Sequence, residues 1–357
     1  MQISIKVKTH SITKNQTLRQ SIVLSASHFL NDFYTGMLFP LLPILISNFG
    51  LTKFSAGALN AFLQWPSILQ PFVGRWSDKI NLQKYIFALP LITGIFLNLI
   101  GVATKVTLIA LLLLLAGISS AFFHGITTPV AGKMAGKQSG KGLSLWIVGG
   151  EIGWMLSPVL IIAFIQTFSF SKTPYLIIPT ALISLFLHSQ LKKMNEIQEP
   201  VNSSAVSLSV ALKSILPMLV PILAVATSRS LLQSIISVYV PTYLTETGMN
   251  LLLAGIALSL VNAGGILGSI VGGIYKDKVG GKPVLFISMI GCTILFFLFL
   301  ITSSFLQMIM LFMTGFFSGM YLPVALSLVQ DYSQQNRSFA SGIYQAYFFS
   351  IGSVASL

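Results

Sequence analysis

The chain has 357 residues, of which 54% are hydrophobic and only 8% are charged, whereas soluble domains carry roughly 25% charged residues. Mean hydropathy is +0.84, and a soluble core cannot absorb that much apolar surface. An ordinary soluble enzyme is therefore excluded, and an integral membrane protein is indicated. The single cysteine, Cys292, excludes a disulfide framework and a cysteine-based metal site.

The N-terminal segment, residues 1–20, carries four basic residues and no apolar core. A cleavable signal peptide needs such a core directly behind its positive end. We therefore interpret this segment as a basic cytoplasmic tail.

Behind the tail, the chain is a succession of apolar stretches. A membrane-spanning helix needs about 20 mostly apolar residues. Ten stretches qualify, at 22–48, 54–74, 85–104, 107–130, 143–167, 174–191, 214–243, 251–274, 283–302 and 305–329. An eleventh, from Phe339 to Leu357, ends with the chain.

Basic residues give the expected orientation. Of the 21 lysines and arginines, 17 lie in the N-terminal tail and in every second loop. The other loops contain only Lys53, Lys105 and Lys172, and Arg229 lies within the seventh stretch. This asymmetry predicts a cytoplasmic N-terminus. It also explains the net charge of +13 by topology, so we expect the lipid bilayer and no nucleic acid as a partner.

A short loop motif occurs twice. Gly74, Asp78 and Lys79 follow the second stretch, and Gly273, Asp277 and Lys278 follow the eighth, 199 residues later. Two halves in the same orientation are the parallel-repeat plan of some secondary transporters. We expect a tail at 1–20, a first half at 21–191, a cytoplasmic linker at 192–213 and a second half at 214–357.

The repeated Gly-x-x-x-Asp-Lys loop resembles the loop signature of the major facilitator superfamily. The resemblance implies an all-α bundle of two six-span repeats and a cytoplasmic latch between them. Asp78 would face the start of the eleventh span near Phe339, and Asp277 the start of the fifth span near Gly142. The alternative is a solvated turn that only sets the topology.

Three further segments resemble the fosmidomycin-resistance branch of efflux transporters. They are His28-Phe29-Leu30-Asn31-Asp32, Gln70-Pro71-Phe72-Val73-Gly74, and Phe123-His124 followed by the small residues of the fifth span. Gly149, Gly150, Gly153 and Pro158 in that span are similar to the antiporter signature of drug/proton exchangers. Small residues at such positions let helices pack closely.

Ionisable residues inside the spans are the candidate site. An unpaired charge at mid-bilayer costs roughly 2.5–3.5 kcal/mol, so each should pair, face water or be neutral. His28 and Asp32 lie four residues apart on one helix face and could exchange a proton; Glu151 could carry one. Arg229 cannot lose its charge and needs an anion, either a carboxylate of the first half or the substrate.

Each of these residues also has a structural alternative. The alternative for the acids is a packing or hydrogen-bonding role, and for Arg229 a permanent ion pair. His124 near the middle of the fourth span could be a hydrogen-bonded core residue or a member of the site. Trp146 and Trp154 are interpreted as packing or interface aromatics rather than cavity walls.

The leading functional hypothesis is a proton-coupled secondary transporter that exports a small molecule or drug by antiport. An importer of a small organic anion by symport is the main alternative, and a non-transporting remnant is a third. A membrane enzyme has no motif in its favour, and no cofactor or metal is expected. We expect a monomer in the cell membrane.

The second half is expected to be incomplete, with about 11 of 12 spans in total. In that case small-residue faces, such as Gly342 and Gly352, would be exposed to lipid.

Overall fold

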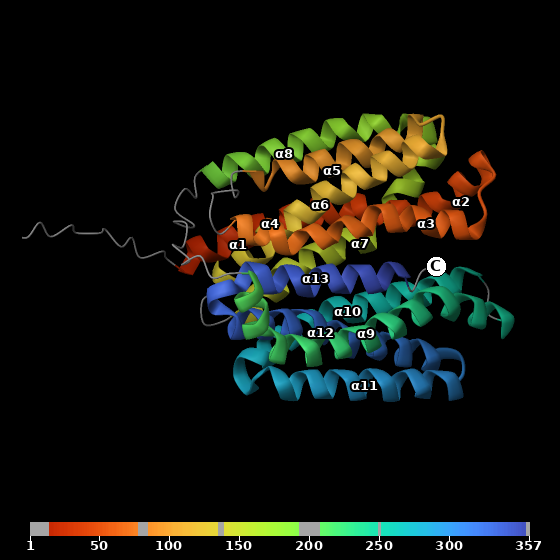
Figure 1. Cartoon of the computed structure of the whole chain (residues 1–357). Coiled ribbons are helices and arrows are strands. Elements are labelled where there is room, and N and C mark those ends of the chain that lie inside the picture. Colours follow the sequence, from red (N-terminus) through yellow and green to blue (C-terminus); the bar gives the residue numbers. More distant parts are fainter. Residues whose placement is uncertain (1–13, 78–84, 135–138, 193–207, 249–250, 355–357) are drawn as a thin grey trace, which may run out of the picture.

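The computed structural model describes residues 14–77, 85–134, 139–192, 208–248 and 251–354, and within these ranges the chain is helical without β-strands. The helices form two bundles that lie side by side (Figure 1). The first bundle contains α1 (Lys14–Gly36), α2 (Leu38–Phe49), α3 (Lys53–Gln64), α4 (Gln70–Ser77), α5 (Ala88–Asn98), α6 (Val106–Met134), α7 (Ser139–Phe168) and α8 (Ile177–Lys192). The second contains α9 (Leu208–Glu246), α10 (Leu251–Val279), α11 (Gly281–Ile301), α12 (Ser304–Tyr332) and α13 (Arg337–Val354).

Short 3₁₀ helices extend or connect these elements. They are η1 (Trp65–Leu69), η3 (Leu99–Val102), η5 (Phe170–Leu176) and η6 (Gln334–Asn336). The all-α prediction is confirmed. Among the described residues, six helical segments are long and apolar enough to cross a membrane, judged by length and composition.

The first predicted span is divided into two helices. α1 ends at Gly36 and α2 begins at Leu38. Pro40 lies four residues after Gly36, and a proline ring clashes with the carbonyl four residues earlier. The break therefore falls where Pro40 prevents a regular helix.

The second predicted span is interrupted in a similar way. Pro66 lies in the first turn of η1, where the α-helical geometry changes to 3₁₀. A 3₁₀ helix has three residues per turn, so Gln64, Ser67 and Gln70 follow one another on one side. This short change of pitch gives the second span a polar row.

The helices on either side of the predicted linker extend into it. α8 ends at Lys192 and α9 begins at Leu208, so residues 192 and 208–213 of the predicted linker are helical. The remainder of the linker, 193–207, lies outside the described residues.

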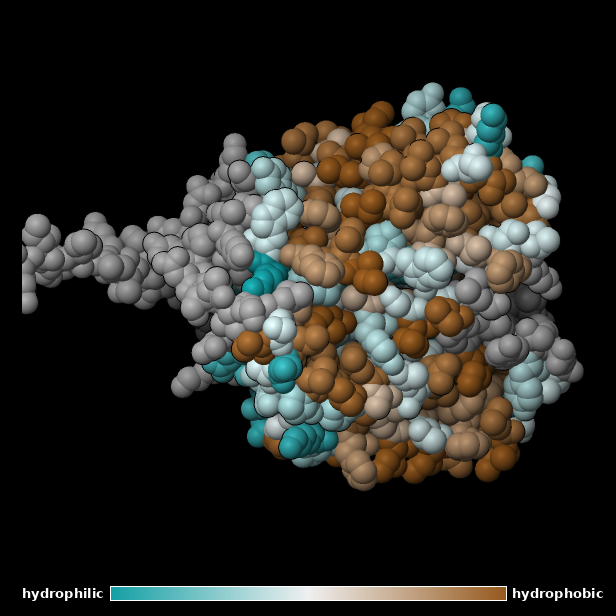
Figure 2. Space-filling view, in the orientation of Figure 1, coloured by the Kyte–Doolittle hydropathy of each residue, from teal (hydrophilic) through white to brown (hydrophobic). Residues whose placement is uncertain are grey.

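The outer surface is apolar, as expected for a multi-pass membrane protein. Figure 2 shows hydrophobic side chains over much of the visible face of both bundles, the most hydrophilic residues toward the helix ends, and weakly hydrophilic residues in the middle of the face. Large side chains on the outermost helices are more than half exposed, such as Leu185 of α8 and Phe286 and Phe297 of α11. In water this surface would be costly, whereas lipid tails solvate it.

The two bundles contact each other closely through α7 with α10 and through α4 with α13. Glycines allow this approach: a Cβ atom at Gly273 would lie 2.5 Å from the carbonyl oxygen of Gly140, and one at Gly342 would lie 2.5 Å from Cα of Pro71. The expectation that Gly342 faces lipid is therefore wrong, because Gly342 is buried against α4. Gly352 has no atom of the described residues within 4 Å of its Cβ position.

Candidate functional site

Three titratable side chains of the first bundle meet between α1 and α6. Nε2 of His28 lies 3.1 Å from Oδ2 of Asp32 and 3.2 Å from Nε2 of His124. Nε2 of His124 lies 3.6 Å from Oδ1 of Asp32. The structure thus brings together three residues expected from the sequence, and it makes His124 a member of the cluster.

The two imidazole rings are held in fixed orientations. Nδ1 of His28 lies 2.7 Å from the carbonyl oxygen of Trp146, and Nδ1 of His124 lies 2.9 Å from that of Ser120. The indole of Trp146 stacks on His28 with ring centroids 3.8 Å apart and an angle of 13° between the planes. Both histidines are buried, whereas the Asp32 side chain is 13% exposed.

Asn31 fastens the cluster to its surroundings. Its Nδ2 donates to Oδ1 of Asp32 at 2.8 Å and to Oγ of Ser120 at 3.0 Å. Its Oδ1 accepts a hydrogen bond of 3.2 Å from the hydroxyl of Thr93 on α5. Because Asn31 is fully buried, these bonds replace those that it would make with water, and they tie α1 to α5 and α6.

The glycines of α7 lie against α1. A Cβ atom at Gly149 would lie 2.2 Å from the carbonyl oxygen of Ser25, and one at Gly153 would lie 2.5 Å from that of Phe29. A Cβ at Gly150 would lie 2.5 Å from Cε1 of His28 and 2.7 Å from Oδ2 of Asp32. Pro158 lies farther along the same helix. Gly150 therefore forms a wall of the cluster as well as a helix contact.

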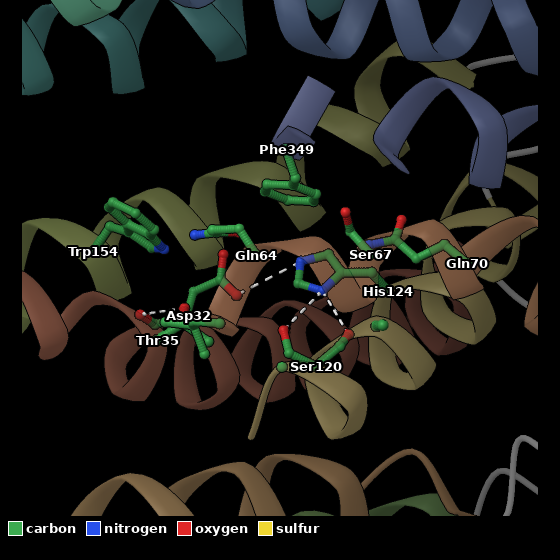
Figure 3. A pocket seen from close by; sticks show the side chains of 12 residues that line it. Asp32, Thr35, Gln64, Ser67, Gln70, Ser120, His124, Trp154 and Phe349 are labelled. Atoms are coloured by element: carbon green, nitrogen blue, oxygen red, sulfur yellow. Dashed lines mark hydrogen bonds and ion pairs between the residues drawn. The ribbon is translucent and has the colours of Figure 1, made fainter. Parts of the chain in front are cut away.

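A pocket opens beside the cluster (Figure 3). Its polar lining comes from α1, α3, η1, α4 and α6, and comprises Asp32, Thr35, Gln64, Ser67, Gln70, Ser120 and His124. Trp154 of α7 and Phe349 of α13 add aromatic walls, and Figure 3 shows Phe349 reaching toward the cluster from the other bundle. The pocket thus lies between the two halves.

Arg229 and Glu151 lie on the two sides of this junction. Arg229 belongs to α9, and its guanidinium lies over the ring of Phe348 of α13, 5.2 Å from the centroid. Its Nε is buried without a hydrogen-bond partner among the described residues. Glu151 of α7 is within electrostatic range of Arg229, Asp32 and His28.

The second copy of the repeated loop motif contacts the first half. The backbone amides of Gly140 and Lys141, in the first turn of α7, donate to the two carboxylate oxygens of Asp277 at 3.1 and 3.0 Å. A carboxylate there also interacts favourably with the helix dipole. The neighbouring Lys276 forms an ion pair of 2.5 Å with Asp331 of α12. Asp277 therefore connects the two halves close to the position expected from the sequence.

The remaining residues of the motif lie in different surroundings, or outside the described residues. A Cβ at Gly74 would lie 2.6 Å from the carbonyl oxygen of Ser338 at the start of α13. Lys278 is exposed and lies 5.8 Å from the centroid of the Tyr275 ring. Asp78 and Lys79 lie outside the described residues.

Trp154 corrects the sequence interpretation, because it lines the pocket. Trp146 stacks on His28, in agreement with the packing role expected for it. Four further residues of the pocket were not predicted from the sequence: Gln64, Ser67, Ser120 and Phe349. Only the row Gln64, Ser67, Gln70 beside Pro66 carried a signal, and that signal depends on the local 3₁₀ pitch.

Comparisons with known proteins agree with this architecture. The family model described as Major Facilitator Superfamily matches residues 24–357. The chain is 24% identical to the fosmidomycin resistance protein of Escherichia coli (strain K12), over 93% of this chain and 83% of the relative. It is 23% identical to the multidrug resistance protein MdtG of Escherichia coli (strain 55989 / EAEC), over 94% and 85%.

Solved structures share the fold at lower sequence identity. A variant of the E. coli fucose:proton symporter FucP superposes with a TM-score of 0.75 at 14% identity, covering 95% of this chain and 90% of that one. The proton:xylose symporter XylE superposes with a TM-score of 0.73 at 14% identity, covering 95% and 87%.

Proposed function

We propose that this transporter, which belongs to the Major Facilitator Superfamily, exports a small molecule in exchange for protons. The observation that carries the proposal is the cluster of His28, Asp32 and His124, which borders a pocket between the two halves. A buried carboxylate with two imidazoles can take up and release a proton, and the pocket beside it can receive a substrate. Protonation of the cluster would then alter substrate binding in the pocket, and substrate binding would alter protonation of the cluster.

Alternating access supplies the motion. In secondary transporters of this plan the substrate binds between the two repeats, which rock about it. Here Asp277 joins α10 to the first turn of α7, and Gly74 lies against the start of α13. We propose that these contacts close the cytoplasmic side and must separate before that side can open. Gly273 permits the close approach, and Asp78, Lys79 and Lys278 complete the gate motif.

Glu151 and Arg229 are proposed to work beside the cluster. Glu151 is the second carboxylate of the proton pathway. The Nε of Arg229, which has no hydrogen-bond partner among the described residues, leaves a donor for an anionic group, and we assign that group to the substrate or to Glu151. The close packing of α7 against α1 lets these groups interact electrostatically, and we assign that packing to Gly149, Gly150, Gly153 and Pro158.

The names of the relatives support export as the direction of transport. Both the fosmidomycin resistance protein and MdtG are named for resistance, which fits export. We place the protein in the cell membrane as a monomer with its N-terminus in the cytoplasm. Fosmidomycin is the first compound to test, because a relative is named for it.

Inside-out membrane vesicles test this proposal. With an imposed pH gradient, acidic inside, a proton antiporter accumulates labelled compound in the lumen, and collapsing the gradient releases it. The result that contradicts export is accumulation only when the lumen is alkaline, because that result indicates symport and import. Vesicles with matched amounts of Asp32→Asn protein provide the background.

A further inference from the structure

The hydrogens of the two imidazole rings can be placed from their partners. A carbonyl oxygen only accepts hydrogen bonds. Because Nδ1 of His28 lies 2.7 Å from the carbonyl of Trp146 and Nδ1 of His124 lies 2.9 Å from that of Ser120, each Nδ1 carries a hydrogen. In a neutral ring, Nε2 is then a bare acceptor.

Those two acceptors face each other. The Nε2 atoms lie 3.2 Å apart, and the Asp32 carboxylate lies 3.1 Å from one and 3.6 Å from the other. Asn31 donates to Asp32 and to Ser120 rather than to either ring. Three acceptors with no hydrogen between them would repel one another in a buried site, so this geometry requires a cation.

The charge of the surroundings selects the cation. One proton neutralises the single negative charge of Asp32, which burial favours. A divalent ion could use the same three donor atoms, which lie within 4.8 Å of one another, but it would leave a net positive charge close to Arg229. Hard cations prefer oxygen ligands, and two of the three donors here are nitrogen. Zinc accepts such donors, and the metal-removal arm of the test below distinguishes it from a proton.

We propose that His28, His124 and Asp32 form one composite site that holds a single proton in this conformation. A hydronium ion breaks an O–H bond and gives the proton to an Nε2 lone pair, which forms an N–H bond and leaves a water molecule. When the N–H bond breaks, the proton returns to water, and no electron is transferred. That the held proton is also the coupling proton rests on the proposed function. The two imidazoles, rather than the carboxylate alone, then bind it.

Every element around the site bears on this proton. α1 supplies His28 and Asp32, and α6 supplies His124. α7 supplies Glu151, which interacts electrostatically with the cluster, and α9 supplies Arg229, which interacts with Glu151. α13 contributes the uncharged ring of Phe349, edge-on to His124.

Nitrogen NMR of the full chain in nanodiscs, with ¹⁵N-labelled histidine, counts the proton directly. The sequence has four histidines, and His188→Gln removes a ring of α8 outside the cluster as the assignment control. At neutral pH we expect hydrogens on both Nδ1 atoms and, in addition, a single proton shared between the two Nε2 atoms, so that the two rings together carry the charge of one imidazolium. In Asp32→Asn, the amide supplies the missing hydrogen, so we expect the imidazolium signal to disappear.

Two neutral rings in the wild-type protein, or hydrogens on Nε2 instead of Nδ1, would overturn the proposal. So would ring signals that change when metal is removed with EDTA, because the cation would then be a metal ion. The deciding signal comes from the wild-type protein, so the answer does not depend on a variant folding. The measurement needs no gradient or substrate: if the proton is present but vesicle flux ignores the pH gradient, the composite site stands and the proposed coupling fails.

Discussion

The ring of Phe349 on α13 lies edge-on against the imidazole of His124 on α6, with centroids 5.5 Å apart. One residue belongs to the second half of the transporter and the other to the proposed proton site of the first. A movement of α13 away from α6 would therefore uncover His124. This contact would link the proposed rocking of the two halves to the exposure of the titratable cluster.

Phe349→Ala should make the membrane leak protons. Without the ring, water reaches His124 while the halves remain closed, so protons pass without substrate. A pH-sensitive dye in proteoliposomes measures the leak, and we expect it to exceed that of the wild type several-fold. Phe297→Ala removes an exposed ring of α11 and serves as the control. A leak equal to that control would show that Phe349 does not seal the site.

Gly150→Ala should disable the cluster while leaving the fold intact. Its methyl group would lie 2.5 Å from His28 and 2.7 Å from Asp32, so these side chains must move apart. Overpacking of this kind costs about 1–3 kcal/mol. We expect the melting temperature to fall modestly and gradient-driven flux to be lost. Gly352→Ala is the matched control, because its Cβ position has no neighbour within 4 Å in the described part of the chain.

Asp277→Ala should favour opening of the predicted cytoplasmic side. It removes two hydrogen bonds from a charged acceptor, each worth about 1.5–3 kcal/mol. Distances between spin labels at the ends of α7 and α10 should show a larger open population. Lys282→Ala removes an exposed charge as the control. An unchanged distance distribution would assign Asp277 a role in topology alone.

Arg229→Lys should weaken substrate affinity although it keeps the charge. Lysine cannot present the planar, two-pronged guanidinium that lies over Phe348. We expect a loss of about tenfold, which corresponds to about 1.4 kcal/mol, in equilibrium binding to purified protein. If Arg229→Lys binds like the wild type while Glu151→Gln alters the stability of the protein, the partner of Arg229 is Glu151 and its role is structural.

Much of the fold could be predicted because hydropathy and length determine it locally. Each apolar stretch contains a helix, and the long loop separates the two bundles. The break at Gly36 and the 3₁₀ turn at Trp65 were not predicted, although Pro40 and Pro66 are present in the sequence. Prolines inside membrane helices are tolerated in many contexts, so their local effect depends on neighbouring helices.

The site could be predicted only in part. Asp32, His28 and Glu151 are conspicuous because charges inside a membrane are costly. The position of His124, Trp146 and Phe349 around them depends on contacts between residues far apart in the sequence, which no local pattern encodes. Gly150 was expected to allow helix packing, but its contact with the cluster requires the register of α7 against α1.

Gradient-driven flux in vesicles containing Asp32→Asn or Glu151→Gln tests the central claim most directly. Proton-coupled export through these carboxylates predicts that each variant inserts into the membrane like the wild type but accumulates no more compound than protein-free vesicles. His188→Gln, which changes a titratable residue of α8, should transport like the wild type. If both acid variants keep the wild-type dependence on the pH gradient, neither carboxylate takes part in proton coupling and the account is wrong.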